Sequence, residues 1–172
     1  MIVLGVDPGT VATGYGVVAG EGNRFHCLTA GDIRSSARNP MEMRLLAIFD
    51  CIESLIAEFH PDAVAVETAF ISKTKSPQTP IKLGQARGVI LLAAARAGLP
   101  VVDVNPVTVK QTVAGNGAAP KEQVIYMIKR LLNLPGDPPS EHAADALGIA
   151  LCHIQRGRYE ALAAGATQGR RR

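Results

Sequence analysis

The sequence has few cysteines, no closely spaced cysteine pair and no long apolar segment, and these shortages exclude several classes of protein. Its three cysteines are scattered, at Cys27, Cys51 and Cys152, and no CxxC motif is present. This pattern argues against a disulfide-stabilised secreted protein and favours a reduced cytoplasmic one. The thiols are then expected to be buried or chemically inert.

Long hydrophobic runs are also missing. The longest, residues 88–102, is interrupted by Arg96 and Pro100 and is too short to cross a bilayer. No cationic segment followed by an apolar run opens the chain, so we expect neither a signal peptide nor a membrane partner. The length of 172 residues and the hydrophobic content of 47% predict one globular domain with a sizeable core.

Charge of one sign is not in large excess, since 18 basic and 15 acidic side chains leave a net charge of +3. The distribution is uneven, because the segment from Glu67 to Lys121 holds seven basic residues after Glu67 and one acid, Asp103. These bases are Lys73, Lys75, Lys82, Arg87, Arg96, Lys110 and Lys121. If the fold gathers them on one side, that side would suit a polyanion. The alternative, that they lie on separate solvated faces, stays open.

Three apolar segments near the N-terminus predict an antiparallel meander. Residues 1–6 end in the turn sequence Asp7-Pro8-Gly9-Thr10, and residues 13–18 and 25–33 follow after short turns. Asp7 is therefore expected at the mouth of a hairpin. A carboxylate at the end of a buried strand is costly unless it is paired, although an aspartate here can also simply cap the turn.

The rest of the chain mixes strands with amphipathic helices, which predicts an α/β domain with five strands. Helical periodicity covers residues 41–59, 81–97, 107–113, 121–134 and 141–155, and compact apolar strands cover residues 63–66 and 101–104. Ser140 is expected to be the N-cap of the last helix. We assign residues 1–156 to the folded domain and expect residues 157–172 to form a disordered basic tail.

Three acids are expected at the ends of separate elements. Glu67 follows the strand at residues 63–66, as Asp7 follows the first strand, and Asp145 lies near the start of the last helix on the same face as His142. If these ends converge, the three carboxylates cannot all stay ionised without a cation. Hard oxygen ligands select Mg²⁺ or Mn²⁺, and two such ions about 4 Å apart can catalyse phosphoryl transfer. Taken singly, each acid could instead be a turn cap, a surface acid or a helix-terminal acid.

Five short motifs then occur in the order typical of one family. They are residues 1–10 with Thr13-Gly14-Tyr15-Gly16, Glu67-Thr68-Ala69-Phe70, residues 82–88 (KLGQARG), residues 109–113 (VKQTV) and residues 143–147 (AADAL). Together they span the chain to about residue 153 and resemble the RuvC family of Holliday-junction resolvases. The resemblance implies a ribonuclease-H-like fold, with a five-stranded mixed sheet flanked by helices, for the nuclease domain at residues 1–156.

The resemblance also implies an activity and a set of site residues. It implies an endonuclease of homologous recombination and DNA repair that nicks two strands of a four-way junction symmetrically, leaving 5′-phosphate and 3′-hydroxyl ends. Catalysis and metal binding fall to Asp7, Glu67, His142 and Asp145, with two Mg²⁺ ions per active site for which Mn²⁺ can substitute. Some family members have Asp where this chain has His142, so His142 either ligates a metal or positions the attacking water.

Contacts with DNA and with other proteins follow from the same resemblance. Phe70 matches an aromatic residue that stacks at the opened crossover, and Lys110 and Lys121 match basic residues near the scissile phosphate. We add the neighbouring bases to the predicted DNA-binding set, namely Lys73, Lys75, Lys82 and Arg87. The implied partners are four-way junction DNA, a second copy of the chain, and the RuvA and RuvB branch-migration proteins.

The helix at residues 81–97 is the expected dimer surface. It is apolar nearly all round, with Gly84 and Gly88 small enough for close approach, although a central core helix would show the same pattern. Two other functions stay open. An actin-like phosphate-loop ATPase fragment would explain the turn at residues 7–10, but 172 residues cannot supply the two domains of that group. A catalytically inactive DNA-binding module would not need the acids.

Overall fold

One mixed sheet organises the protein. The computed structural model describes residues 1–68 and 78–169, with side chains as far as residue 157. Its five strands are β1 (Ile2–Asp7), β2 (Ala12–Glu21), β3 (Arg24–Arg34), β4 (Ala63–Glu67) and β5 (Val101–Val104), in the spatial order β3-β2-β1-β4-β5. The pairs β1–β2 and β2–β3 are antiparallel, which confirms the predicted meander, and β1–β4 and β4–β5 are parallel.

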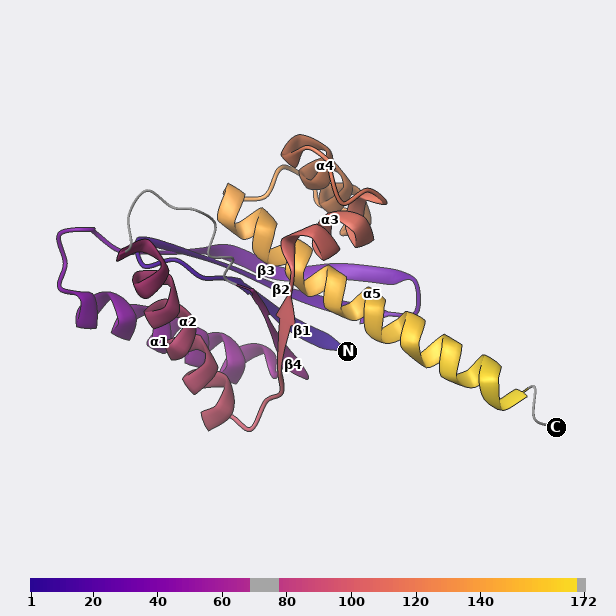
Figure 1. Ribbon diagram of the computed structural model, residues 1–172, viewed down its shortest axis with the longest axis horizontal. Helices are drawn as coiled ribbons and strands as arrows, with labels where there is room; N and C mark the ends of the chain where they lie inside the picture. The colour runs from indigo at the N-terminus through magenta and orange to yellow at the C-terminus, as the bar shows by residue number, and fades with distance from the viewer. Residues whose placement is uncertain (69–77, 170–172) are drawn as a thin grey trace.

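Helices cover both faces of this sheet (Figure 1). The helices α1 (Met41–Phe59) and α2 (Gln78–Arg96) lie on one face, and they make the crossover connections that parallel strands require. The helices α3 (Pro106–Ala114), α4 (Lys121–Leu131) and α5 (Glu141–Gly169) lie on the other face. The result is the predicted five-stranded mixed sheet flanked by helices.

Each face of the sheet has its own core, because neighbouring strand residues point to opposite sides. Along β1, Leu4 and Val6 are fully buried in the cluster that α1 and α2 complete. Val3 is fully buried in the other cluster, which includes Leu147 and Leu151 of α5. The near-continuous apolar run at the start of the chain thus serves two cores.

Glycines of β1 and β2 leave a shallow groove on the sheet surface, and α5 packs into it. A Cβ atom built on Gly5 would stand 2.1 Å from the carbonyl oxygen of Ala146, and one on Gly14 would stand 2.1 Å from the carbonyl oxygen of His142. Further along β2, a Cβ on Gly16 or Gly20 would collide with α5 side chains in the same way. The backbone of α5 therefore approaches the sheet more closely than any side chain on these strands would permit.

Several helix ends differ from the prediction, and α2, for example, begins at Gln78 rather than at residue 81. The helix α4 ends at Leu131 rather than at residue 134, because Asn133 adopts a left-handed φ of 50° that breaks the helix. The helix α5 continues to Gly169, well past residue 155 where its apolar periodicity stops, and it extends beyond the edge of the sheet (Figure 1). The division between a folded domain and a tail at residue 156 stays a prediction. No helix in the described part of the chain combines the length and hydropathy needed to cross a membrane.

Candidate metal-dependent nuclease site

Two of the predicted acids meet because β1 and β4 are adjacent parallel strands. The register pairs Val6 with Val66, so the residues that end the two strands, Asp7 and Glu67, lie side by side. Their side chains are hydrogen-bonded to each other. The carboxyl ends of parallel strands lie at the same edge of the sheet, where open α/β sheets place their ligand sites.

The first turns of α5 bring the other two predicted residues to this edge. The His142 Nδ1 atom and the Asp7 Oδ2 atom are 2.8 Å apart and share a hydrogen bond. Asp145 lies one turn further along and interacts electrostatically with both Asp7 and Glu67. Gly14 makes this approach possible, since the backbone of His142 occupies the space that a side chain on β2 would need. The structure therefore brings all four predicted catalytic residues together.

Crowding of these acids changes their protonation. Burial raises the pKa of Glu67, and the neighbouring Asp7 and Asp145 raise it further, to about 8. Burial also raises the pKa of Asp145, although Lys121 opposes this change. At neutral pH a proton on Glu67 thus reduces the electrostatic repulsion among the carboxylates. A divalent cation bound at the site would reduce the same repulsion.

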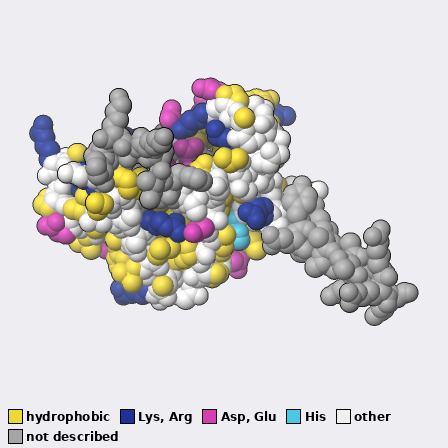
Figure 2. Space-filling model, in the orientation of Figure 1, with side chains coloured by type: hydrophobic (Ala, Val, Ile, Leu, Met, Phe, Trp, Pro, Cys, Tyr) yellow, Lys and Arg dark blue, Asp and Glu magenta, His cyan; other side chains and the backbone are white. Residues whose placement is uncertain are grey.

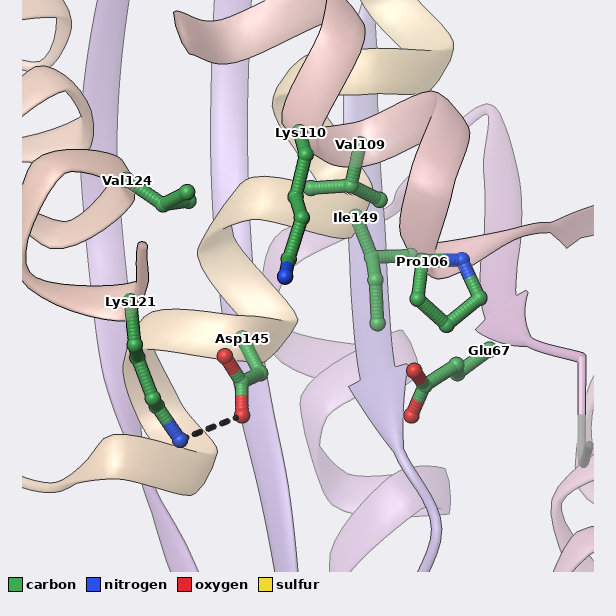
Figure 3. Close-up of a pocket in the computed structure, with 8 residues that line it drawn as sticks. All are labelled: Glu67, Pro106, Val109, Lys110, Lys121, Val124, Asp145 and Ile149. Carbon is green, nitrogen blue, oxygen red and sulfur yellow. Dashed lines mark hydrogen bonds and ion pairs between the residues drawn. The ribbon is translucent and has the colours of Figure 1, made fainter. Parts of the chain in front are cut away.

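Two lysines share a cavity with these carboxylates. The cavity measures about 240 Å³, and the carboxyl groups of Glu67 and Asp145 and the amino groups of Lys110 and Lys121 all point into it (Figure 3). The Lys121 Nζ atom lies 3.2 Å from Asp145 Oδ2 and 2.9 Å from Glu141 Oε2. Burial would lower the pKa of Lys121, but these two acids together raise it, so the lysine is held in its charged form.

The donor set fits a hard divalent cation in its chemistry, since it consists of carboxylates and one imidazole. Within the described ranges, no three His, Cys, Asp or Glu side chains already surround a single point as ligands. Lys121 bonds to one Asp145 oxygen, and Asp7 is engaged with both His142 and Glu67. The candidate ligands therefore bond to a lysine and to one another in this structure.

The predicted DNA-binding residues divide into three groups. Phe70, Lys73 and Lys75 lie outside the described residues. Lys82 is exposed on α2, whereas Lys110 lines the cavity. Arg87 is only 18% exposed at its side chain; it forms an ion pair with Asp103 and donates to the backbone carbonyl of Glu67 at 3.2 Å. This geometry makes Arg87 a support for the end of β4.

The surface does not show one broad basic patch on the side seen in Figure 2. Lys and Arg side chains there stand in small separate groups, with Asp and Glu side chains between them. The prediction that the central bases form a single polyanion-binding face therefore stays a prediction. Among the described bases, the two that lie at the acids, Lys110 and Lys121, are the best placed to meet a phosphate.

Sequence reasoning missed the residues that hold the site together. The buried Arg44 of α1 donates to the backbone oxygen and the hydroxyl of Thr10, at 2.7 and 2.5 Å, and so braces the turn after Asp7. Asp32 of β3 accepts the hydroxyl hydrogen of Ser140 at the start of α5. Burial alone would raise the pKa of Asp32, but hydrogen bonds from Ser140 and Arg34 lower it. Helical periodicity places Arg44 on the apolar side of α1, which is a detectable signal, whereas nothing in the sequence pairs Asp32 with Ser140.

Comparison with known proteins gives a consistent family. The family model described as crossover junction endodeoxyribonuclease RuvC matches residues 3–153. The chain is 46% identical to the RuvC of Syntrophomonas wolfei over 154 residues, which cover 90% of this chain and 88% of that one. It is 47% identical to the RuvC of Tolumonas auensis over 152 residues, which cover 88% and 86% of the two chains.

Solved structures agree with the sequence matches. The chain resembles the Thermus thermophilus RuvC in complex with a Holliday junction substrate, with a TM-score of 0.88 and 38% identity over 93% of this chain and 96% of that one. The yeast mitochondrial Holliday junction resolvase, at a TM-score of 0.60 and 13% identity, covers 87% of this chain and 76% of that one and shares the fold alone. These neighbours confirm the ribonuclease-H-like architecture.

Proposed function

This chain belongs to the RuvC family of crossover junction endodeoxyribonucleases, and we propose that it resolves Holliday junctions by metal-dependent hydrolysis at Asp7, Glu67, His142 and Asp145. The observation that carries this proposal is that two strand ends and one helix start meet. Asp7 lies beside Glu67 and bonds to His142, and Glu67 and Asp145 line a cavity together with two lysines. The family supplies the substrate, and the geometry supplies the residues for a phosphodiester-hydrolysing site.

We propose that Mg²⁺, for which Mn²⁺ can substitute, binds at these four residues with two ions per site. Bound there, the metal would supply a lowered pKa for the attacking water and charge stabilisation for the leaving oxygen. The pKa of Glu67 is raised chiefly by burial and further by the neighbouring acids Asp7 and Asp145, and this clustering of carboxylates supports a cation-binding role. Hydrolysis of this kind is expected to leave 5′-phosphate and 3′-hydroxyl ends.

The Asp7–His142 hydrogen bond sets the role of the imidazole. In the tautomer that donates from His142 Nδ1 to Asp7, the other ring nitrogen, Nε2, keeps a free lone pair. That lone pair can ligate a metal or take a proton from water, and the carboxylate fixes the tautomer and the ring orientation for either role. Asp7 thus serves as a metal-ligand candidate and as the orienting group of His142.

The lysines provide the phosphate-binding part of the site. Lys110 and Lys121 direct their amino groups into the cavity beside Glu67 and Asp145, where a scissile phosphate would lie (Figure 3). Contacts of this type position the backbone without reading sequence. We propose that Phe70, Lys73, Lys75 and Lys82 extend this contact along the junction, and that Arg87 acts through its support of β4.

We propose that the active form is a homodimer built on α2. One face of this helix is buried and the opposite face is exposed and largely apolar, with Ile81 at 64% and Leu92 at 60% exposure. Neither Gly84 nor Gly88 on that face has an atom within 4 Å of an added Cβ, so a second helix could approach closely. A two-fold axis there would present two sites to two strands of the junction.

The dimer would work with four-way junction DNA and with the RuvA and RuvB branch-migration proteins in the cytoplasm, in homologous recombination and repair. The family match argues against the ATPase-fragment hypothesis. ATP hydrolysis by the purified protein, measured alongside DNA cleavage, would test that hypothesis directly. Junction binding without any cleavage would favour the inactive DNA-binding module.

The deciding experiment compares cleavage of a four-way junction and of a linear duplex with Mg²⁺. The wild type should nick the junction selectively, and Asp7→Asn should lose cleavage by about three orders of magnitude or more while still binding the junction, because one ligand is neutralised and the basic side chains remain. Asp50→Asn, an exposed substitution of the same chemistry on α1, is the matched control. Full activity in Asp7→Asn would contradict the site assignment.

A further inference from the structure

Asp32 is a buried carboxylate beside the first turn of α5, and both of its oxygens are engaged. Its side chain is 7% exposed. Oδ2 accepts from Arg34, whose Nη2 atom is 2.8 Å away and whose side chain is 73% exposed. Oδ1 accepts the hydroxyl hydrogen of Ser140. The carboxylate thus links a solvent-facing cation to the start of the helix that carries two of the site residues.

Ser140 connects Asp32 to the first turn of α5. Its oxygen accepts from the backbone N–H of Ala143 at 2.9 Å, which makes Ser140 the N-cap, as predicted from the sequence. A hydroxyl has one hydrogen and two lone pairs. Once the hydrogen is directed to Asp32, a lone pair is directed to Ala143. Asp32 therefore determines the orientation of the group that caps the helix.

The strand register explains why the Ser140 cap affects the positions of the candidate catalytic residues. Across the sheet, Asp7 pairs with Gly14 and Gly14 pairs with Asp32, so the three residues form one row. The first turn of α5 lies on the middle position, since a Cβ on Gly14 would stand 2.1 Å from the carbonyl oxygen of His142. Asp7 holds the turn from one side through His142, and Asp32 holds it from the other side through Ser140.

Resting on the function proposed above, we propose that Asp32 is a positioning residue for metal-dependent cleavage. By fixing the Ser140 cap, it sets the placement of His142 and Asp145 relative to Asp7 and Glu67. It has no contact with the cavity itself, whose lining includes Glu67 and Asp145 but not Asp32. Its role is therefore that of an outer residue that orients ligands, a class whose loss typically costs about 10- to 100-fold in activity or metal affinity.

The test is single-turnover cleavage of a four-way junction as a function of Mg²⁺ concentration. In Asp32→Ala the Mg²⁺ concentration for half-maximal rate should rise, or the saturated rate should fall, by about tenfold or more. Junction affinity measured in Ca²⁺ should stay unchanged, because no basic side chain at the cavity is altered. Wild-type Mg²⁺ dependence together with a wild-type rate would overturn the proposal.

Two further variants separate positioning from general destabilisation. Asp32→Asn keeps an oxygen that can accept the Ser140 hydroxyl, so it should recover most of the lost rate; an equal loss in the Asn and Ala variants would overturn the proposal in favour of a direct charge role. Asp62→Ala is the matched control, because Asp62 accepts from the backbone N–H of Ile2 at 2.7 Å, at the end of β1 far from the site. It should lower the melting temperature and leave the Mg²⁺ dependence unchanged.

A double-mutant cycle gives an independent test. Asp32→Ala and Ser140→Ala each remove the same contact, so their combined effect on the Mg²⁺ dependence should be smaller than the product of the separate effects, and fully multiplicative effects would overturn the proposal. Failure of the proposed function would show differently, as absence of Mg²⁺-dependent junction cleavage in the wild type itself.

Discussion

The two faces of the sheet are packed by different means. On the face of α1 and α2, fully buried side chains such as Leu4, Val6 and Ile52 fill the space between sheet and helices. On the face of α5, glycines of β1 and β2 let the helix backbone approach the strands directly. Added volume is costly in both cores, and on the α5 face even one methyl group at Gly5 or Gly14 would collide with the helix backbone.

This difference corresponds to a division of roles. The candidate active site lies at the edge of the sheet on the α5 face. There the positions of His142 and Asp145 depend on how closely α5 packs on Gly14. The α2 face ends in an exposed apolar surface around Ile81 and Leu92, which suits a second copy of the chain. Side chains pack both faces, and close backbone packing is added on the α5 face, where the site residues need fixed positions.

The largest effect on stability and cleavage should come from adding a side chain at Gly14, where α5 packs on the sheet. Gly14→Ala places a methyl group against the backbone oxygen of His142, so α5 must shift or lift. We expect a loss of about 3 kcal/mol or more in unfolding free energy, and at least a 100-fold loss of junction cleavage. Chemical denaturation and single-turnover cleavage measure the two effects.

The matched control is Gly84→Ala on the exposed face of α2, where an added Cβ meets nothing. In the monomer it should raise helix stability by about 1 kcal/mol, because alanine favours the helix. If Gly14→Ala and Gly84→Ala behaved alike, the contrast between the two faces would be wrong.

The next effect concerns the apolar surface of α2. Leu92→Glu introduces a charge at a position that is 60% exposed in the single chain, so the unfolding free energy of the monomer should change by no more than about 0.5 kcal/mol. The dimer dissociation constant should rise by about 100-fold, since burying an unpaired carboxylate at an interface is costly. Sedimentation equilibrium measures it. A Leu92→Glu protein that dimerises as the wild type does would place the interface elsewhere.

A third comparison distinguishes a residue that supports the site, Arg87, from a residue proposed to contact DNA, Lys110. Arg87→Gln removes a charge that is paired with Asp103 inside the fold, so junction cleavage should fall by about tenfold while the salt dependence of junction binding keeps its slope. Lys110→Gln should instead reduce the slope of log affinity against log salt by about one. Binding titrations at several salt concentrations measure both, and a reduced slope in Arg87→Gln would make it a DNA contact.

The smallest effect is the pH dependence of stability without metal. The folded-state pKa of Glu67 is raised to about 8. The proton on Glu67 therefore contributes its full stabilisation of the fold at pH values below the ordinary pKa of glutamate, and this stabilisation is lost as the pH rises through about 8. Glu67→Gln should abolish this loss and melt on the order of 4 °C higher than the wild type at pH 9.

Two controls sharpen the pH measurement. The exposed Glu42→Gln should follow the wild-type profile. Mg²⁺ added to the wild type at pH 9 should raise its melting temperature, because a cation would replace the lost proton. A wild-type melting temperature that does not change between pH 5 and pH 9 would contradict the crowding of acids at the site.

The sequence alone determined most of the elements and the identities of the acids. Helical and strand periodicity is a local property, so α1 was predicted residue for residue and Asp7 and Glu67 were placed correctly at strand ends. The end of α4 was predicted wrongly, because the apolar pattern continues to Leu134 although Asn133, two residues before Pro135, is a helix-ending signal.

Only the tertiary structure decided which distant residues meet. Arg87 was predicted to bind DNA, which stays a prediction. The structure adds its contacts with Asp103 and the end of β4, which charge counting cannot reveal. Likewise, the row of Asp7, Gly14 and Asp32 exists only because two strand pairings fix their register. Periodicity is encoded over a few residues, whereas register, close backbone approach and hydrogen-bond partners depend on contacts between separate segments of the chain, such as those of Asp32 and Ser140.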